Sequence, residues 1–278
     1  MNRKRPYGDE FLRLARDQPV ELERVALECA ADVCPRVPLE ECLARLDRLA
    51  EQVQVPFALP PLTAKERRQM LQAIAVVLYE QEGFRGTVED YYNPQNSLLH
   101  RVLQRRVGIP LTLGIIFRSV AVRLGLDVFA VSTPGHFMLG CQLAGRRWYI
   151  DPFNRGELLD QPSCRRRVEE MSGPQQWSPV CFRRASHRQV IARLLRNLKN
   201  ALVMADRWEQ ALLIQQRLLV LCPQHEAERR DMGLILLRNG QPHAALDYLQ
   251  RYQHQHPDEA EMLRPFVKAA RRLAAEMN

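Results

Sequence analysis

Apolar residues recur at helical spacing through the first eighty residues of the chain. Residues 11–14, 39–53 and 63–82 show this spacing, and so does the segment 20–33. Such positions share one face of a helix. In the segment 20–33 they are Leu22, Val25, Ala26, Cys29 and Val33. The pattern predicts amphipathic helices over these segments, interrupted after residue 53 by a proline-containing extended connector at 55–62.

Local signals mark the ends of the helices that follow. Thr63 precedes Glu66 by three residues, the arrangement of a capping box. After a loop at 84–96, Asn96 or Ser97 is expected to cap a short helix that ends before Gly108. The next helix, 111–124, is apolar nearly all round, with Pro110 before it. A helix of this composition is normally buried at the centre of a domain.

After residue 125 the hydrophobic period changes from 3.6 to 2. The alternation predicts strands at 127–131, 136–143 and 147–150, with Ala144-Gly145 as a tight turn between the last two. Residues 153–177 carry Pro, Gly and Ser and are expected to hold one short helix. A final strand is expected at 180–182.

From residue 186 the chain is helical and repeats itself. Pro223 and Pro257 are 34 residues apart, and so are Ala211 and Ala245. A 34-residue period with a small helix residue and a closing proline resembles the tetratricopeptide repeat. Residues 190–257 would form two repeats, and 258–277 a capping helix. We therefore expect one domain at 1–187, with a helical part at 10–82 and a core at 83–187, and a helical module at 188–278.

Composition indicates an ordinary globular protein with few special chemical features. Hydrophobic residues make up 46% of the 278 residues and charged residues 26%. No apolar run reaches the ~20 residues of a membrane helix, and residues 1–7 lack the apolar core of a secretory signal. The seven cysteines are scattered and form no CxxC pair, so neither a disulfide framework nor a thiolate metal site is expected. We expect a cytoplasmic protein without metal or cofactor.

The formal net charge of +8 comes largely from arginine, with runs such as 105–106 and 165–167. One interpretation is an anionic partner, either nucleic acid or an acidic protein surface. The other is a set of solvated helix faces. Because no aromatic-rich RNA motif or zinc finger accompanies the charge, nucleic acid is the less favoured partner.

The predicted hairpin brings a histidine and an aspartate together. A two-residue turn pairs even-numbered with odd-numbered residues, and paired residues share a face of the sheet. His136 and Asp151 therefore fall on the same face, whereas Cys141 points to the other. A carboxylate beside an imidazole fixes its tautomer, as in the base and orienting group of a catalytic triad. The alternative is a structural His–Asp hydrogen bond that holds the hairpin.

A triad also needs a nucleophile, which would lie at the N-terminus of the buried helix. There the helix dipole and a protonated histidine lower the pKa of a thiol. The segment 110–114 (Pro-Leu-Thr-Leu-Gly) contains no cysteine.

Five motifs, in this order and spacing, resemble the SirB1 family: Tyr91-Tyr92-Asn93-Pro94-Gln95-Asn96-Ser97, Arg105-Arg106-Val107-Gly108-Ile109-Pro110, Arg123-Leu124-Gly125-Leu126, Pro134-Gly135-His136-Phe137 and Ile150-Asp151-Pro152-Phe153. The resemblance covers roughly residues 10–278. It implies an α+β fold: a transglutaminase-like, cysteine-protease-type domain, mostly helical around a small antiparallel sheet, then an all-α tetratricopeptide-like module. It also implies that His136 and Asp151 occupy the triad positions. Thr112 lies near the cysteine position, where family members commonly carry Ser or Thr.

Thr112 has two interpretations. As a nucleophile its hydroxyl would need a well-placed base, because its pKa is far above that of a thiol. As a structural residue it would cap the helix or hydrogen bond to a nearby carbonyl. The second interpretation makes the constellation a relic triad that keeps a pocket for binding.

A set of residues around the loop 84–96 and the hairpin are candidates for binding. Asn93 and Asn96 flank Pro94, where Asx-turns would fix the loop. Alternatively, side chains of this region line a cleft, and the planar guanidinium of an arginine binds a carboxylate or amide there. The candidates are Tyr92, Asn93, Asn96, Arg105, Arg106 and Phe137.

Three functions remain open on these grounds. The leading hypothesis is a non-catalytic transglutaminase-like protein that acts as a protein- or peptide-binding or regulatory module through its cleft and residues 188–278. The second is an amide-bond hydrolase or acyltransferase that uses His136 and Asp151 with Thr112 or water. The third is a factor associated with RNA or translation, suggested by the arginine excess.

Overall fold

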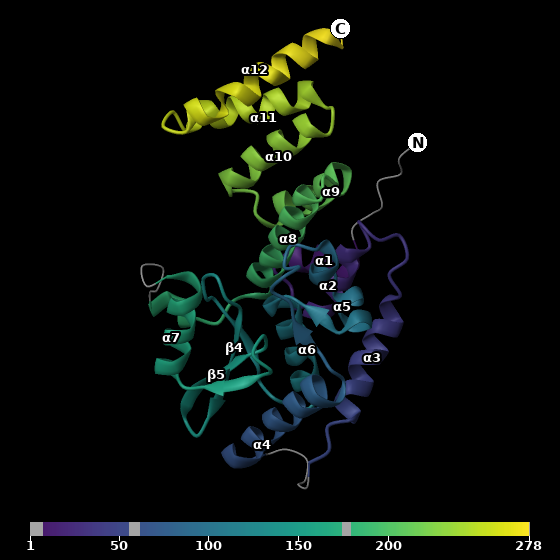
Figure 1. The fold of residues 1–278 in the computed structure, drawn as a ribbon, viewed down its shortest axis with the longest axis vertical. Helices are drawn as coiled ribbons and strands as arrows, with labels where there is room; N and C mark the ends of the chain where they lie inside the picture. The colour runs from purple at the N-terminus through teal and green to yellow at the C-terminus, as the bar shows by residue number, and fades with distance from the viewer. Residues whose placement is uncertain (1–7, 56–61, 174–178, 278) are drawn as a thin grey trace. The chain divides into compact units, whose positions relative to one another are not determined.

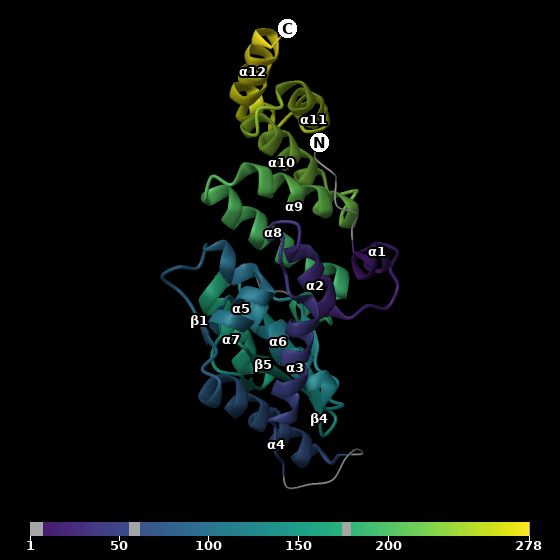
Figure 2. The ribbon, with the colours of Figure 1, turned by 90° about the vertical axis from the view of Figure 1, so that its right-hand side faces the viewer.

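The computed structural model describes residues 8–55, 62–173 and 179–277. Contacts divide the chain into two compact units, whose described residues run 8–194 and 195–277 (Figures 1 and 2). The division falls inside one helix, α8, a few residues after the expected boundary at 187. The predicted connector at 55–62 lies mostly outside the described residues. Each unit is described separately below.

The first unit begins with four helices at the predicted places. They are α1 (Asp9–Ala15), α2 (Leu22–Ala30), α3 (Leu39–Glu51) and α4 (Ala64–Ala75). The capping box is present: the Thr63 hydroxyl accepts a hydrogen bond from the Glu66 backbone, and the Glu66 carboxylate accepts one from the Thr63 backbone. Apolar positions of each helix are buried, which is the stripe that the periodicity predicts.

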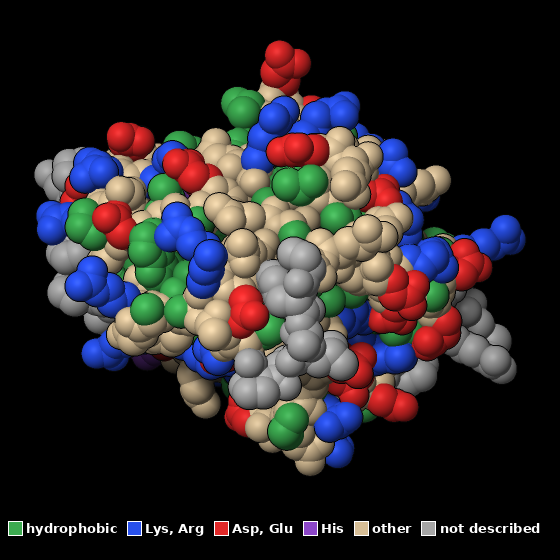
Figure 3. All heavy atoms as spheres, turned by 90° about the horizontal axis from the view of Figure 1, so that it is seen from below, with side chains coloured by type: hydrophobic (Ala, Val, Ile, Leu, Met, Phe, Trp, Pro, Cys, Tyr) green, Lys and Arg blue, Asp and Glu red, His purple; other side chains and the backbone are tan. Residues whose placement is uncertain are grey.

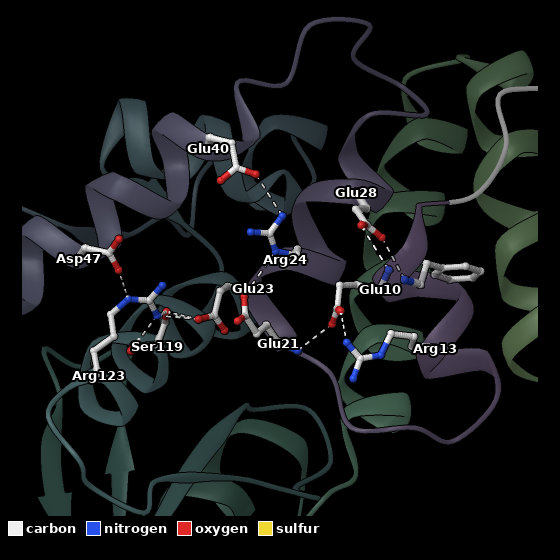
Figure 4. A network of polar contacts seen from close by, with 11 residues as sticks. Glu10, Arg13, Glu21, Glu23, Arg24, Glu28, Glu40, Asp47, Ser119 and Arg123 are labelled. Atoms are coloured by element: carbon white, nitrogen blue, oxygen red, sulfur yellow. Dashed lines mark hydrogen bonds and ion pairs between the residues drawn. The ribbon is translucent and has the colours of Figure 1, made fainter.

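Helices α1 and α2 cap each other through carboxylates (Figure 4). Glu28 of α2 accepts hydrogen bonds from the backbone nitrogens of Glu10, at 3.3 Å, and Phe11, at 2.9 Å. Glu10 in turn accepts one from the backbone nitrogen of Glu21, at 3.0 Å, just before α2. A negative charge at a helix N-terminus satisfies free N–H groups and opposes the positive end of the helix dipole.

A second polar contact joins α2 to the central helix α6 (Pro110–Arg123) (Figure 4). The buried carboxylate of Glu23 accepts hydrogen bonds from the Ser119 hydroxyl, at 2.8 Å, and from Arg123, at 2.6 Å. Burial raises the pKa of Glu23, but the hydrogen bond from Arg123 and its neighbours outweigh this and leave the pKa lowered. The carboxylate is therefore charged and paired.

The predicted helix at 63–82 is not α-helical to its end. After α4 the chain continues as a π-helix, η1 (Val76–Gln81), and Glu82 then pairs with Arg106 at 3.1 Å. The loop 84–96 also holds a short strand that periodicity missed. This strand, β1 (Arg85–Gly86), pairs in parallel with β2 (Val107–Gly108). Two-residue strands carry no repeating pattern, so only their pairing reveals them.

Between these strands lie η2 (Pro94–Ser97), a 3₁₀ turn, and α5 (Leu99–Arg105). The expectation that Asn96 or Ser97 caps α5 is wrong: Leu98 is the N-cap residue and no side chain caps the helix. Both polar side chains are buried instead. The central helix α6 begins with Pro110, as predicted, and is buried along most of its length. Gly125 follows it with φ +75°, a conformation that favours glycine.

The sheet has four antiparallel strands in sequence order. They are β3 (Phe129–Val131), β4 (Met138–Leu143), β5 (Arg146–Asp151) and β6 (Glu157–Leu159). Ala144 and Gly145 both have positive φ, as a type I′ turn requires, and so confirm the predicted hairpin. The strand β6 was not predicted. Residues 179–182 form a 3₁₀ turn, η4 (Pro179–Phe182), rather than the expected strand, and Arg184 makes an isolated bridge to Val131.

The short helix expected within 153–177 is α7 (Gln161–Ser172), which packs on β5 and β6. Asp160 caps it by accepting a hydrogen bond from the Ser163 backbone, at 2.9 Å. Its buried side chains join those of the sheet in one cluster. This cluster consists of Phe129, Val131, Met138, Tyr149, Leu159, Cys164, Val168 and Phe182.

The second unit is entirely helical among its described residues. It contains the C-terminal part of α8 (His187–Met204), then α9 (Trp208–Leu221), α10 (Glu226–Arg238), α11 (Pro242–Gln255) and α12 (Ala260–Glu276). Ala211 and Ala245, 34 residues apart, are both fully buried at equivalent positions of α9 and α11. Gly233 allows α10 to approach α11 closely, since a Cβ there would lie 2.8 Å from Leu249. The repeat read from the sequence is therefore a structural repeat.

Candidate functional site

His136 and Asp151 meet at the end of the hairpin. His136 lies in the turn before β4 and Asp151 is the last residue of β5. In the β4–β5 hairpin, Leu143 pairs with Arg146 and Leu139 pairs with Ile150. If this register is continued beyond the strands, His136 and Asp151 fall on the same face of the sheet. The His136 Nε2 and the Asp151 Oδ1 are 2.8 Å apart, and both side chains are buried. The juxtaposition that the parity argument expects is present.

Asp151 is held by several donors at once. Its Oδ1 also accepts hydrogen bonds from the backbone nitrogens of Phe153, at 3.1 Å, and Asn154, at 3.2 Å. Its Oδ2 accepts one from the Asn154 side chain, at 2.7 Å. Burial raises the pKa of Asp151, but the hydrogen bond from His136 and the other donors outweigh it and lower the pKa. Because an ionised carboxylate only accepts, the Nε2 of His136 carries a proton.

Arg167 is a further partner of Asp151 that the sequence did not single out. From α7 its guanidinium donates to the Asp151 Oδ2, at 2.7 Å, and to Glu157 of β6, at 2.9 Å. In the sequence, the arginine triplet 165–167 indicates only positive charge. Its register on α7 decides which of the three faces the site, and a charge run does not reveal that.

The turn that carries His136 is fixed by polar contacts from both sides. Gly135 has φ +63°, and the Thr133 hydroxyl donates to the carbonyl of His136. Arg193 of α8 donates to the Thr133 carbonyl, at 2.7 Å, and its guanidinium lies 5.7 Å from the centre of the Phe137 ring. The sequence gives no signal for Arg193, which lies 60 residues after Thr133.

Gly114 lets the hairpin approach the central helix α6. A Cβ at this position would lie 2.4 Å from the Phe137 ring and 3.3 Å from Pro152. The residues after His136 and after Asp151 therefore both pack on this point of α6. Phe137, a predicted binding residue, is buried there.

Thr112 is the third residue of α6, and its hydroxyl forms hydrogen bonds with backbone groups near the start of this helix. The Oγ1 accepts a hydrogen bond from the Ile109 backbone nitrogen, at 3.2 Å. Its single proton can be donated to the Asn96 carbonyl, 2.9 Å away, or to the Ile109 carbonyl, 3.1 Å away. Its hydrogen bonds among the described residues go to these backbone groups and not to His136. A Cβ at Gly108 would lie 2.7 Å from this oxygen, so the chain is tight here.

The two predicted asparagines organise the loop before α5. Asn93 accepts a hydrogen bond from the Gln95 backbone, at 2.9 Å, which is the expected Asx-turn. Asn96 is fully buried; it donates to the Asp90 carbonyl, at 2.5 Å, and accepts from Arg105, at 3.0 Å. Arg105 is thus engaged inside the loop.

Arg106 and Tyr92 are the predicted binding residues that stay on the surface. Arg106 ends α5 with φ +61° and is paired with Glu82. Tyr92 is 56% exposed, and its ring meets that of Tyr91 edge-on, with centres 5.3 Å apart. Of the six candidates, the structure therefore buries Asn96 and Phe137, half-buries Asn93 and Arg105, and leaves Tyr92 and Arg106 exposed.

Tyr79 is a residue of the site that sequence reasoning missed. It belongs to the π-helix η1, and its hydroxyl is buried with no hydrogen-bond partner in the described part of the chain. Its ring lies against Gly156, in the turn that follows Asp151. Burial, together with the charge of Asp151, raises the pKa of the phenol. The hydroxyl is therefore neutral.

The cysteines near the sheet are not activated. Cys164 is fully buried in the cluster beneath α7, and burial and Asp151 raise its pKa to about 12. Burial raises the pKa of Cys141 to about 12 as well. Cys141 lines a cavity of about 390 Å³ with residues such as Leu71, Leu126 and Val128. Neither thiol has the lowered pKa of a catalytic cysteine.

In the described residues, neither a cluster of metal ligands nor a membrane-spanning helix is found. Within 8–55, 62–173 and 179–277, no three His, Cys, Asp or Glu side chains come close enough together to hold a metal ion. No helix there combines the length and apolar character that spanning a membrane requires. On the face drawn in Figure 3, basic and acidic side chains are interspersed with apolar ones.

Each of the two units has a counterpart among known protein families. Residues 40–196 match the transglutaminase-like superfamily, and residues 198–273 match the tetratricopeptide repeat. The chain is 35% identical to a UPF0162 protein of Xylella fastidiosa over 67% of this chain and 68% of that protein. It is 31% identical to protein SirB1 of Salmonella typhimurium, over 70% of this chain and 74% of that protein. A UPF0162 protein of Vibrio cholerae is 28% identical over 90% of this chain and 92% of its own length.

No solved structure matches the chain. The matching segments follow the same order as the two units, and relatives named both SirB1 and UPF0162 align with most of the chain. The chain therefore belongs to the SirB1-like (UPF0162) family, with a transglutaminase-like domain followed by tetratricopeptide repeats.

Proposed function

We propose that this protein does not catalyse a reaction and instead binds a protein or peptide through its tetratricopeptide unit, with the transglutaminase-like domain kept as a scaffold. The observation that carries the proposal is the state of Thr112. Its hydroxyl hydrogen bonds to Ile109 and Asn96 at the start of α6. A nucleophilic hydroxyl must lie within hydrogen-bond reach of the base. Here the hydroxyl instead hydrogen bonds to backbone groups at the N-terminus of the helix.

The environment of Asp151 supports the same proposal. Asp151 accepts hydrogen bonds from His136, Phe153, Asn154 and Arg167, so its carboxylate ties together several segments of the domain. The pair is also closed to solvent, because His136 is 1% exposed and Asp151 is 0% exposed. Such a paired, buried and hydrogen-bonded arrangement serves as a rigid joint between the end of β5, α7 and the His136 turn.

The helical repeats supply the binding surface in this proposal. Tetratricopeptide repeats stack into curved arrays whose surfaces hold extended peptides or partner helices. The match of residues 198–273 to this repeat supports a protein-interaction module.

Affinity capture tests the proposal. Immobilised full-length protein is exposed to cell lysate alongside His136→Gln, which keeps a donor for Asp151 and removes the imidazole. We expect both proteins to retain the same partners. In parallel, incorporation of a fluorescent amine into lysate proteins and into casein is measured for both. The proposal predicts no incorporation above the His136→Gln level.

Two observations favour the enzymatic alternative. With a proton on Nε2, the Nδ1 of His136 is the nitrogen left to act as a base, and Tyr79 holds a buried hydroxyl near Asp151. Amide hydrolysis or acyl transfer by the wild type, lost in His136→Gln while the fold is unchanged by circular dichroism, would establish this alternative and end the non-catalytic proposal.

A further inference from the structure

A groove of about 270 Å³ is present in the tetratricopeptide unit. It lies among α8, α9, α10 and α12, the helices drawn in green to yellow in Figure 1. Its walls are apolar and mostly half-buried, so they are accessible from outside. They are formed by Val203, Trp208, Leu234, Ile235 and Phe266. A space of this size accepts one large aliphatic or aromatic side chain.

The charges at the base of the groove compensate each other. Lys199, which is buried, donates to Glu228, at 3.0 Å, and to Asp231, at 2.6 Å. Arg196 also donates to Glu228, at 2.6 Å, and Arg230 lies 3.0 Å from Asp231. Burial raises the pKa of Glu228, but Arg196 and Lys199 lower it to about 2. Each of these charged groups therefore already has a partner of opposite charge within the unit.

The rim differs from the base because it offers free donors. Arg238 is exposed, and its guanidinium lies 5.8 Å from the centre of the Trp208 ring. Among the described residues it has no ion-pair partner. Asn200, also exposed, lines the same groove and carries a side-chain amide. A planar guanidinium with an adjacent amide suits a carboxylate, which both can bind by hydrogen bonds.

We propose that this groove binds a segment of a partner protein in which a large apolar side chain is accompanied by an acidic side chain two positions away. This inference rests on the proposed function and specifies its ligand. The apolar side chain enters the pocket between Trp208 and Phe266. In an extended segment, residues i and i+2 point to the same face, so the acidic side chain reaches Arg238 from there.

Apolar burial and a charged contact would make different contributions to binding. Burial of the apolar side chain supplies most of the affinity, as at other protein interfaces with aromatic anchors. The contact of the carboxylate with Arg238 supplies the choice of sequence. A basic residue at that position would face an unpaired guanidinium and be rejected.

Selection from a random dodecapeptide library displayed on phage tests the inference. The full-length protein is the bait, and Arg238→Glu is the key variant because this exposed side chain contributes no core packing. The wild type should enrich peptides with a large apolar residue and Asp or Glu two positions away. Synthetic copies of these peptides, followed by fluorescence polarisation, should bind Arg238→Glu at least about tenfold more weakly. Raising the salt concentration should weaken wild-type binding.

Arg251→Glu is the matched control, since Arg251 is exposed on α11 and does not line the groove. It should bind the selected peptides like the wild type. Enrichment without an acidic preference, equal losses in both variants, or no enrichment would overturn the inference. A concentration-dependent dimer that Arg238→Glu dissociates would overturn it too, by identifying a second copy of the chain as the occupant. The lysate capture described above remains the separate test of the binding function itself.

Discussion

At the scale of single residues, the hydrogen bonds of Thr112 are the main argument for a non-catalytic role. Its hydroxyl satisfies the Ile109 nitrogen and the Asn96 carbonyl, which are buried backbone groups. Thr112→Val keeps the shape and removes both hydrogen bonds, so we expect the free energy of unfolding to fall by about 2 kcal/mol. Urea denaturation followed by circular dichroism measures this loss.

Thr112→Ser is the control, because it keeps the hydroxyl and removes only a methyl group. It should lose clearly less stability than Thr112→Val. Equal losses in the two variants would mean that packing of the methyl group, and not the hydrogen bonds, accounts for the role of Thr112.

His100 provides a second prediction at this scale. It is buried in α5, and neither ring nitrogen has a hydrogen-bond partner in the described residues. Burial, with a smaller effect of Arg101, lowers its pKa to about 4 from the ordinary 6.5. Below pH 6.5 the unfolded chain binds a proton that the folded chain does not. His100 therefore costs stability as pH falls from about 6.5 to 4, by up to about 3 kcal/mol.

His100→Leu removes this cost. The difference in unfolding free energy between the variant and the wild type should grow as pH falls through this range and level off below pH 4. Denaturation at pH 7, 6, 5 and 4 measures it. A difference that does not depend on pH would show that His100 takes up its proton equally in both states.

At the scale of elements, the contact between α6 and the hairpin depends on Gly114. In an isolated helix, replacing an interior glycine by alanine stabilises by about 1 kcal/mol. Here the new Cβ would lie 2.4 Å from the Phe137 ring. We therefore expect Gly114→Ala to destabilise the protein by about 1–3 kcal/mol, the reverse of the helix-propensity effect.

A double substitution separates the two causes. Phe137→Leu removes ring atoms that the Cβ would meet, so Gly114→Ala should cost less in that background. Thermal or urea unfolding of the four proteins gives the coupling energy. Additive effects would indicate that the strain lies elsewhere in α6.

At the scale of the whole molecule, the two units predict local rather than global effects. Glu228→Gln takes a charge from the buried network around Lys199, and we expect a loss of about 3 kcal/mol. The pKa of Glu228 is lowered to about 2 from 4.5, so its stabilising effect is present above pH 4.5 and disappears as pH falls toward 2. Hydrogen exchange should show faster exchange in residues 195–277, and little change in residues 8–194.

Arg251→Glu serves as a control for this experiment, since it changes a charge on the exposed side of the same unit. It should leave exchange near the wild-type pattern. Uniformly faster exchange of the whole chain after Glu228→Gln would show that the two units unfold together.

Many elements of this fold can be predicted from short-range sequence patterns. The capping box at Thr63 and Glu66, Pro110 at the start of α6 and the Ala144-Gly145 turn all act within a few residues. Their physical effect does not depend on the rest of the chain, so they can be read directly. The 34-residue repeat is readable for a related reason, since equivalent helices bury equivalent small residues.

The same patterns failed where packing overrides local preference. Asn96 has the chemistry of a helix cap, but it is buried between Asp90 and Arg105 and caps nothing. The π-helix η1 continues the apolar spacing of α4, so the sequence pattern does not distinguish it from an α-helix. For Asn96, the competing contact with Arg105 comes from another element.

By itself, the sequence determined the order of the main helices and the β4–β5 hairpin, the two-part organisation and the meeting of His136 with Asp151. These follow from periodicity, turn chemistry and the alternation of a hairpin, which are local. Only the tertiary structure decided what surrounds that pair. Arg167 and Arg193 reach the site from helices 16 and 60 residues beyond their partners, and the Thr112 hydroxyl meets a carbonyl 16 residues before it. Such contacts arise from how helices pack, and no spacing along the chain encodes them.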